Sequence, residues 1–465
     1  MRRLIQMILR TPMPVVALLL VSQSAWSAGF ALLEQSSSRL GTAFSGTAAA
    51  ADDASTIYFN PAGMLNLERN EALLSFSDIK IKSEFADSAS QAAFAQTLGN
   101  EGGDAGGWNF VPSAYWSSKI GDRLALGLGV NAPFGLKLEY DPNWIGRFQA
   151  RRSEIKTLNI NPAIALRIND YFSVGVGVDY QRIQAELSSA VNYSAAIAQG
   201  LQQLVLGGTL TPMQAAALTA ANAGLQGHTV VDGDDWAWGF NVGLLFDVSA
   251  NTRIGIHYRS PIDYTLTGDV NFSAPAIAEP TGASIIATAS AAGGPLSSGA
   301  VSAKIKMPGS ATVSLWQRVA PRVELLADAA WTDWSSIDEL RVIRTSGATL
   351  SVTPEDWRNT WRVAFGGAFE LNPTWKLRAG VAYDQSPVPD ATRTPRVPDG
   401  DRNWVALGAR WSPTQSIGVD FGYTHIFVKD APLSQNAGNA SAYGYIVGEQ
   451  NSQIDIVSAQ VSYKF

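Results

Sequence analysis

Three arginines stand at positions where the chain can bind an anion. Arg259, Arg362 and Arg378 each lie in a segment in which apolar and polar residues alternate, and each is on the polar side of that alternation. A guanidinium group binds a carboxylate through paired, charge-assisted hydrogen bonds. Two interpretations follow: these arginines contact the carboxylate of a ligand, or they pair with acidic side chains of the same chain.

Other kinds of chemistry leave no signature in the sequence. His228, His257 and His425 do not show the spacing of metal ligands, and the chain has no cysteine. No Gly-x-Ser-x-Gly nucleophile motif occurs. We therefore expect no metal, no cofactor and no enzymatic activity. One alternative stays open, because a catalytic triad can be assembled by the fold from residues that are distant in sequence.

The charge balance excludes one class of partner. The 465 residues include 34 Lys and Arg against 40 Asp and Glu, a net charge of −6. A nucleic-acid-binding surface needs clustered positive charge, so we expect no nucleic-acid partner. Charged residues make up only 16% of the chain, compared with roughly 25% in soluble domains.

The N-terminus has the features of a secretory signal. Arg2, Arg3 and Arg10 precede an apolar run at 15–21, and small residues follow at Ala25 and Ser27. This pattern predicts a signal peptide at 1–27 with cleavage before Ala28. An uncleaved anchor is the alternative, but the run is shorter than the ~20 residues that a spanning helix needs.

The rest of the chain alternates with period two. The last strand has apolar residues at Val457, Ala459, Val461, Tyr463 and Phe465, with polar residues between them. Such alternation gives a strand one apolar and one polar face. Aromatic residues lie at the ends of the apolar faces, and amphipathic rings at both strand ends are typical of membrane barrels rather than soluble sandwiches.

The alternation defines about 14 strands, an even number as in bacterial barrels. Short connections alternate with long ones. We therefore predict an all-β fold, a 14-stranded antiparallel transmembrane β-barrel over residues 67–465. The predicted strands lie near 71–86, 108–119, 122–136, 147–168, 172–191, 229–248, 252–272, 301–318, 322–344, 357–371, 374–386, 401–412, 416–429 and 452–465.

Residues 28–66 show no strand pattern and have a length suited to filling a barrel lumen. Asn60-Pro61-Ala62 predicts a local turn, since proline fixes its own φ and restricts the residue before it. Tyr58, Phe59 and Met64 are poor residues for a free tail. We interpret 28–66 as a hatch inside the barrel, and a disordered N-terminal tail is the alternative.

Several segments resemble a known family. The segment "GFALLEQSSSRLGTAFSGTAAAADDASTIYFNPAGM" is similar to the hatch of the FadL/TodX-type outer-membrane transporters of hydrophobic compounds. The similarity continues in "PFGLKLEYDPNWIGRFQA", "KTLNINPAIALRIND", "YRSPIDYTLTGDV" and "DQSPVPDATRTPRVPDGDRNW". It implies a 14-stranded barrel plugged by an N-terminal hatch, in the outer membrane of a Gram-negative bacterium.

The resemblance implies a path for an apolar ligand from the extracellular loops to a pocket above the hatch, and then sideways through a kinked third strand. The loop at 192–228 is our predicted landing groove, because Ile197, Leu201, Leu204 and Val205 share one helical face. The alternative is that this loop only packs on the loop at 273–300. Pro133, Phe134 and Gly135 interrupt the third strand and predict the wall gap, beside which we expect the Asn60-Pro61 turn. An ordinary strand end is the alternative there.

Passive uptake of long-chain fatty acids is the leading prediction for function. A monoaromatic hydrocarbon transporter, an outer-membrane lipase and a polar porin are the alternatives. Fatty-acid carriers of the family have basic residues late in the fifth strand and in the fifth loop, whereas this chain has "LSSAVN" and "LSVTPED" there. We expect the partners to be the hydrophobic ligand, outer-membrane lipid and lipopolysaccharide, and the protein to be a monomer.

Overall fold

The computed structural model describes residues 29–436 and 440–465. The predicted signal peptide at 1–27 lies outside the described residues. Within the described residues, no helix is both long enough and apolar enough to cross a membrane.

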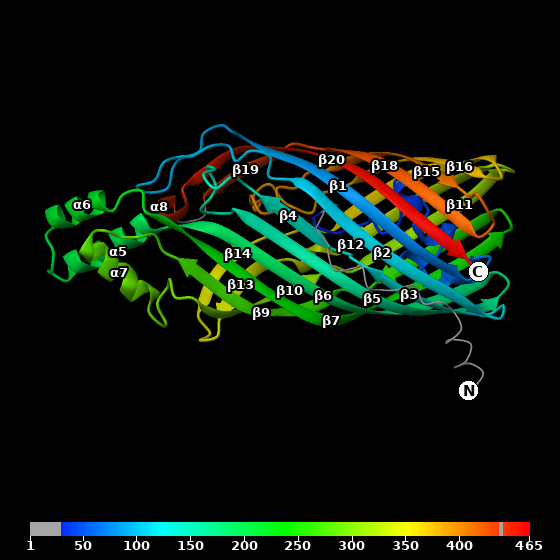
Figure 1. Cartoon of the computed structure of the whole chain (residues 1–465), viewed down its shortest axis with the longest axis horizontal. Coiled ribbons are helices and arrows are strands. Elements are labelled where there is room, and N and C mark those ends of the chain that lie inside the picture. The colour runs from blue at the N-terminus through cyan, green and yellow to red at the C-terminus, as the bar shows by residue number, and fades with distance from the viewer. Residues whose placement is uncertain (1–28, 437–439) are drawn as a thin grey trace.

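The described chain forms a closed antiparallel barrel of 14 strands, as predicted (Figure 1). The barrel closes where β1 pairs with β20 over the full length of β1. Nine wall strands are continuous: β1 (Glu71–Asp87), β2 (Gly107–Ile120), β5 (Arg152–Asn169), β6 (Phe172–Asn192), β7 (Gln226–Ser249), β16 (Trp375–Asp384), β17 (Arg402–Trp411), β18 (Ile417–Val428) and β20 (Tyr445–Lys464).

Five wall strands are interrupted, which the period-two pattern did not reveal except at the third. Each consists of two shorter strands along one line of the wall: β3 (Leu124–Asn131) with β4 (Gly135–Glu139), β8 (Thr252–Arg259) with β9 (Ile262–Ser273), β10 (Gly299–Met307) with β11 (Ser310–Ala320), β12 (Val323–Thr332) with β13 (Glu339–Arg344), and β14 (Thr349–Pro354) with β15 (Thr360–Asn372). A further strand, β19 (Ala431–Asn436), extends the wall as a partner of β20.

The outer face of the wall is apolar and carries aromatic residues at two levels. Phe172 stacks on Phe246 near the short turns, with ring centroids 4.7 Å apart. Tyr180 stacks on Trp236 closer to the long loops, at 4.6 Å. Exposed aromatic rings at two heights, with exposed aliphatic side chains such as Val176 and Val178 between them, match the two interfaces of a bilayer.

The long loops carry the helices and gather at the end opposite the C-terminus (Figure 1). They contain α5 (Tyr193–Leu206), α6 (Pro212–Ala221), α7 (Pro280–Ser290) and α8 (Ala440–Tyr443), and a short 3-10 turn, η2 (Trp334–Ser336), fills one strand interruption. Thr211 caps α6 through a reciprocal bond pair with Gln214, and Pro212 opens the helix. This is the N-cap arrangement expected from the sequence.

The hatch fills the half of the barrel nearer the short turns. It consists of α2 (Ser37–Leu40), α3 (Thr47–Ala50), α4 (Thr56–Phe59) and η1 (Pro61–Asn66), and nearly all of it is buried. The segment is drawn in blue inside the wall in Figure 1. Polar side chains of the wall hold it: the Thr47 backbone N–H donates to Asp328 at 2.9 Å.

Glycines in the wall make room for the hatch backbone. A Cβ atom at Gly255 would lie 1.9 Å from the Ala48 carbonyl oxygen, and one at Gly380 would lie 2.1 Å from that of Thr42. Such contacts are shorter than any side chain tolerates. The backbone of the hatch therefore packs directly against the backbone of the wall at these glycines.

Candidate ligand cavity and wall gap

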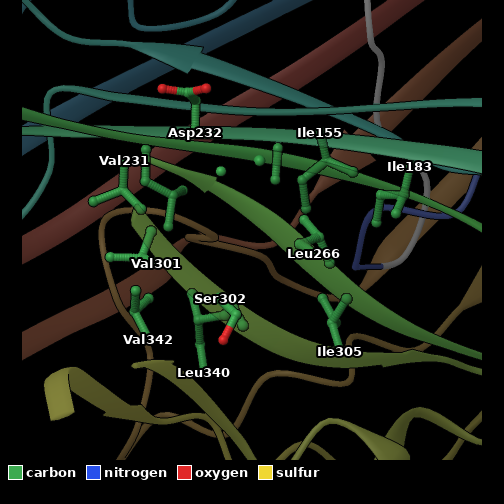
Figure 2. Close-up of a pocket in the computed structure, with 15 residues that line it drawn as sticks. Ile155, Ile183, Val231, Asp232, Leu266, Val301, Ser302, Ile305, Leu340 and Val342 are labelled. Atoms are coloured by element: carbon green, nitrogen blue, oxygen red, sulfur yellow. The ribbon is translucent and has the colours of Figure 1, made fainter. Parts of the chain in front are cut away.

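An apolar cavity of about 80 Å³ lies inside the barrel, between the hatch and the long loops. Figure 2 shows aliphatic side chains from β5, β6, β7, β9, β10 and β13 around it. Asp232 and Ser302 are the only polar residues among those that line it, and no basic residue does. Such a lining solvates an alkyl chain or a hydrocarbon and offers no counter-ion for a carboxylate. The labelled residues are Ile155, Ile183, Val231, Asp232, Leu266, Val301, Ser302, Ile305, Leu340 and Val342.

A second, polar cavity of similar size lies directly on the hatch. Its floor consists of hatch residues that include Leu33, Phe44 and Tyr58, and its sides carry charged groups from the wall. His257, Arg259, Asp328 and Arg362 are among these wall residues.

On the neighbouring strands β9 and β10, three buried side chains lie between the residues that line the two cavities. Leu266 and Ile305 line the apolar cavity, while Arg259 and Ser310 line the polar one further along the same wall strands. The residues between them are Ile262, Tyr264 and Met307, which are at most 4% exposed. Tyr264 lies opposite Ile305, and Ile262 lies opposite Met307. Movement of this layer would join an apolar chamber to a charged one.

Two of the three predicted arginines pair with acids of the wall. Arg259 Nη1 lies 2.5 Å from Asp179, and its guanidinium stacks 4.4 Å from the ring centre of Tyr58. Arg378 Nη1 lies 2.6 Å from Asp420. These two arginines therefore pair with acidic side chains of the same chain, the second of the two interpretations of their role. A ligand carboxylate would have to displace a buried partner to reach either.

Arg362 has a different environment. It donates to the Ala43 carbonyl oxygen of the hatch and lies over the Trp404 ring, 5.2 Å from its centre. Its Nε has no hydrogen-bond partner, and within the described residues no carboxylate oxygen lies within ion-pair distance of it. Arg362 therefore combines two features among the predicted arginines: it lines the polar cavity and, in the described structure, no carboxylate lies within ion-pair distance of it.

The third wall strand is broken at residues 132–134. β3 pairs with β2 through Ala114–Ile120, whereas β4 pairs with β5 and makes no ladder with β2 in the described structure. The first residues of β2, 107–113, pair with β1 only. We call this opening between 107–113 and β4 the wall gap. It contains Pro133, Phe134 and Gly135, the residues that the sequence pointed to.

The wall gap is closed from inside by the first residues of the hatch. Leu32 N donates to the Pro133 carbonyl at 2.7 Å, and Gly135 N donates to the Phe30 carbonyl at 2.9 Å. Ala31 lies opposite Phe134 as an antiparallel bridge. We call residues 30–32 the gap segment. It supplies the backbone partners that the broken strand has lost on this side.

The expected position of the Asn60-Pro61 turn was wrong. Asn60 Nδ2 donates to the carbonyls of Leu244, on β7, and Ala48, and its side chain accepts from Ala62 N. Pro61 packs against Gly175 of β6. The turn therefore fixes the hatch to another part of the wall. Sequence reasoning missed the gap segment because its bonds join residues about a hundred positions apart.

The predicted loop groove is partly a contact between loops. Ile197 and Leu201 are at most 1% exposed and pack with Ile286 of α7. Leu204 and Val205 are half-buried. The alternative, that the loop at 192–228 packs on the loop at 273–300, thus accounts for Ile197 and Leu201. The exposed apolar side chains of this region are Leu206 and Met213, 74% and 83% exposed.

The histidines form no recognisable catalytic or metal group. His425 Nδ1 lies 2.8 Å from Asp455 on the outer face of the wall, and the same carboxylate accepts from Tyr423. His257 is buried next to Arg259, and its Nε2 makes no hydrogen bond. Within residues 29–436 and 440–465, no cluster of His, Asp and Glu could hold a metal ion.

Comparison with known proteins agrees with the architecture. Residues 18–465 match the family described as outer membrane protein transport protein (OMPP1/FadL/TodX). The chain is 30% identical over 438 residues to the long-chain fatty acid transport protein of Escherichia coli O6:H1 (strain CFT073), covering 92% of this chain and 93% of that protein.

Solved structures give the same result. A Pseudomonas aeruginosa FadL homologue superposes with a TM-score of 0.83 at 28% identity, covering 94% of this chain and all of the other. The Pseudomonas putida toluene transporter TodX superposes with a TM-score of 0.64 at 16% identity, covering 89% of this chain and 94% of the other. The second similarity, at this identity, concerns the fold alone.

Proposed function

Because the chain belongs to the outer membrane transport protein family of FadL and TodX, we propose that it takes up long-chain fatty acids by passive diffusion. Its similarity to the long-chain fatty acid transport protein of E. coli extends over nearly the whole of both chains. The outer-membrane location and the uptake of hydrophobic compounds follow from the family. The choice of fatty acids and the route are our proposal.

The observation that carries the proposal is the apolar cavity together with a wall gap that the gap segment of the hatch closes. Each methylene that leaves water for an apolar lining gains about 0.8 kcal/mol. The cavity accepts part of an alkyl chain as it stands, and displacement of the layer at Tyr264 and Met307 would lengthen the site toward Arg362. No energy source is needed, because the ligand moves down its own gradient.

We propose that release is lateral. Once the gap segment moves, the opening between β2 and β4 gives an alkyl chain a lateral path from the lumen to the surrounding lipid. The gap segment then returns, since unpaired backbone groups in an apolar medium cost several kcal/mol each, roughly. The extracellular helices α5 to α7 would supply the first contact with the ligand, through exposed residues such as Leu206 and Met213.

Monoaromatic hydrocarbons are the second candidate cargo, and one observation favours them. The apolar cavity has no basic residue in its lining, as suits a neutral ligand. A thermal-shift comparison separates the two, because a ligand that binds the folded state stabilises it by mass action. We expect oleate to raise Tm more than toluene at equal free ligand concentration, because the tighter ligand then stabilises the folded state more. A larger shift with toluene would favour the hydrocarbon.

We also propose that the protein is not an enzyme and works as a monomer surrounded by outer-membrane lipid and lipopolysaccharide. Barrel closure through β1 and β20 pairs the first and last wall strands with each other, so neither needs a strand from a partner chain. Fatty acid released from phospholipid by the purified protein would contradict the first statement and favour the lipase alternative. A dimer by light scattering in detergent would contradict the second.

The cavity itself can be tested by filling it. Ala303 lies on β10 within the lining, so Ala303→Phe should occupy the space needed by the alkyl chain. We expect oleate affinity and uptake to fall about tenfold or more, the effect of losing a few buried methylenes. Ala379→Phe, on the outward face of β16, is the matched control and should leave uptake unchanged. Full uptake by Ala303→Phe would place the binding site elsewhere.

A further inference from the structure

Glu34 is a buried carboxylate without a hydrogen-bond partner. It lies two residues beyond the gap segment, its exposed fraction is 0%, and neither side-chain oxygen makes a hydrogen bond with any described residue. Its neighbours in sequence are fixed on both sides: Leu33 lines the polar cavity, and Gln35 Nε2 donates to the Ala132 carbonyl at 2.8 Å. An ionised carboxylate in such a place is costly unless a charge compensates it.

Two arginines of the wall face this carboxylate with unused donors. Arg402 pairs with Asp399 and lies 3.9 Å from Asp384, yet its Nε and Nη1 make no hydrogen bond. Arg362 Nε is likewise without a partner. Both guanidinium groups act electrostatically on Glu34. The arginines of the wall therefore have unused N–H donors, while the Glu34 carboxylate of the hatch is an acceptor without a hydrogen-bond partner.

Arg362 and Arg402 do not need Glu34 as a counter-ion, because other acidic side chains already lie near them. Asp384 and Asp328 already face Arg362, and Asp399 with Asp384 already faces Arg402. On the hatch side, Tyr58 faces both Glu34 and Arg259. Arg259 is matched by Asp179.

Since three aspartates already outnumber the two arginines, an ionised Glu34 adds a further negative charge. Burial raises the pKa of the Glu34 carboxyl to about 7, and the nearby backbone N–H of Glu34, the charges of Arg402 and Arg362 and the backbone N–H of Leu33 offset part of that effect.

We propose that Glu34 takes up a proton when the anionic head group of a ligand binds at Arg362. The inference rests on the proposed function, because it concerns the head group of a long-chain ligand. The ligand carboxylate replaces the negative charge of Glu34 in the field of Arg362 and Arg402. The proton adds to a carboxylate oxygen of Glu34, and the bond that breaks is that of a hydronium ion or buffer acid in solution, or the O–H bond of the ligand itself when it arrives as the free acid. No other bond changes.

This exchange makes the binding of an anion depend on pH. Above pH 7 an ionised Glu34 opposes a second negative charge, so the head group binds weakly. Below pH 7 Glu34 is neutral and the opposition disappears. For one group that titrates near pH 7, the affinity for an anion should increase about tenfold between pH 8 and pH 6. A neutral ligand of the same length should show no such change.

The test uses two C16 probes whose own charge is constant. Hexadecanesulfonate stays ionised throughout, and hexadecanol stays neutral. Isothermal titration calorimetry of the purified barrel in a neutral detergent gives the affinity at pH 6, 7 and 8. Repetition in buffers of different ionisation enthalpy counts the protons taken up. We expect proton uptake with the sulfonate and none with the alcohol.

Variants assign the effect to Glu34. Glu34→Gln should bind the sulfonate at pH 8 about as tightly as the native protein does at pH 6, a gain of about tenfold, with the pH dependence lost. Glu68→Gln, at an exposed carboxylate beyond the hatch, is the matched control and should behave as the native protein. Heat-modifiable migration on gels shows whether each variant has a folded barrel.

The outcomes separate the inference from the proposed function. Hexadecanol binding together with pH-independent sulfonate binding would overturn the inference alone, as would a Glu34→Gln variant that keeps the pH dependence. Failure of both probes to bind would overturn the proposed function and the inference with it. If Glu34→Gln does not fold, the proton count of the native protein still decides, because sulfonate binding without proton uptake refutes the exchange.

Discussion

Locking the gap segment onto the wall should stop transport without unfolding the barrel. Ala31 and Phe134 form an antiparallel pair flanked by the bonds from Leu32 N to Pro133 O and from Gly135 N to Phe30 O. This pattern defines a non-hydrogen-bonded pair, whose Cα atoms are about 4.5 Å apart and suit a disulfide. The chain contains no cysteine, so Ala31→Cys with Phe134→Cys leaves no competing thiol.

The expected magnitude follows from the contacts that opening must break. Two backbone bonds and the Gln35 bond to Ala132 cost about 1 kcal/mol each. Exposure of the buried Phe30 side chain adds about 2 kcal/mol. A total of about 5 kcal/mol leaves roughly one molecule in several thousand open at any moment. A covalent bond removes that population, so uptake should fall to background.

The assay is the uptake of labelled oleate by cells that carry the oxidised double variant, with reduction to restore uptake. Each single-cysteine variant should transport normally. A second pair, Ser37→Cys with Ser75→Cys, joins the hatch to β1, since their hydroxyl oxygens are 3.2 Å apart. Passage straight through the barrel needs the whole hatch to move. If the Ser37–Ser75 disulfide blocks uptake while the variant with the Ala31–Phe134 disulfide still transports oleate, lateral release is refuted.

Arg362→Ala should weaken oleate binding about tenfold and spare decane in the same assay; equal losses for oleate and decane would make Arg362 structural. Arg378→Ala should lower the thermal stability of the barrel, because Asp420 loses the nearer of its two arginine partners and keeps only Arg410. Replacing Leu206 and Met213 with Asp should reduce uptake severalfold at low oleate concentration with normal heat-modifiability, and unchanged uptake would exclude this surface. Deleting residues 29–62 should raise single-channel conductance in planar bilayers, and an unchanged value would mean that the segment does not obstruct the lumen.

Period-two alternation predicted the wall well, because it is a local property of each strand. It located the C-terminal strand, β20, and the interruption at Pro133, where the missing proline N–H prevents a ladder. It did not predict the break after Arg259, although Pro261 follows there. Apolar and polar residues alternate in the expected way on both sides of that break, so the alternation alone gives no sign of it.

The site was harder to predict than the wall, because its residues meet only after the barrel closes. The type and position of Arg259 and Arg378 suggested an anion site, but their acidic partners come from other strands. The gap segment lies far from β4 in sequence and had no pattern of its own. Glu34 follows an apolar stretch, and a single acid there has no pattern that predicts its burial.

The backbone fit between hatch and wall constrains any exchange of parts among related barrels. Where Gly255 meets Ala48 and Gly380 meets Thr42, a wall with larger residues would reject this hatch, and another hatch would leave these glycines facing a void. A chimaera therefore needs its wall glycines to be transplanted together with its hatch. Wall strands and hatch form one inherited unit, whereas the extracellular helices, which rest on each other, can be changed independently.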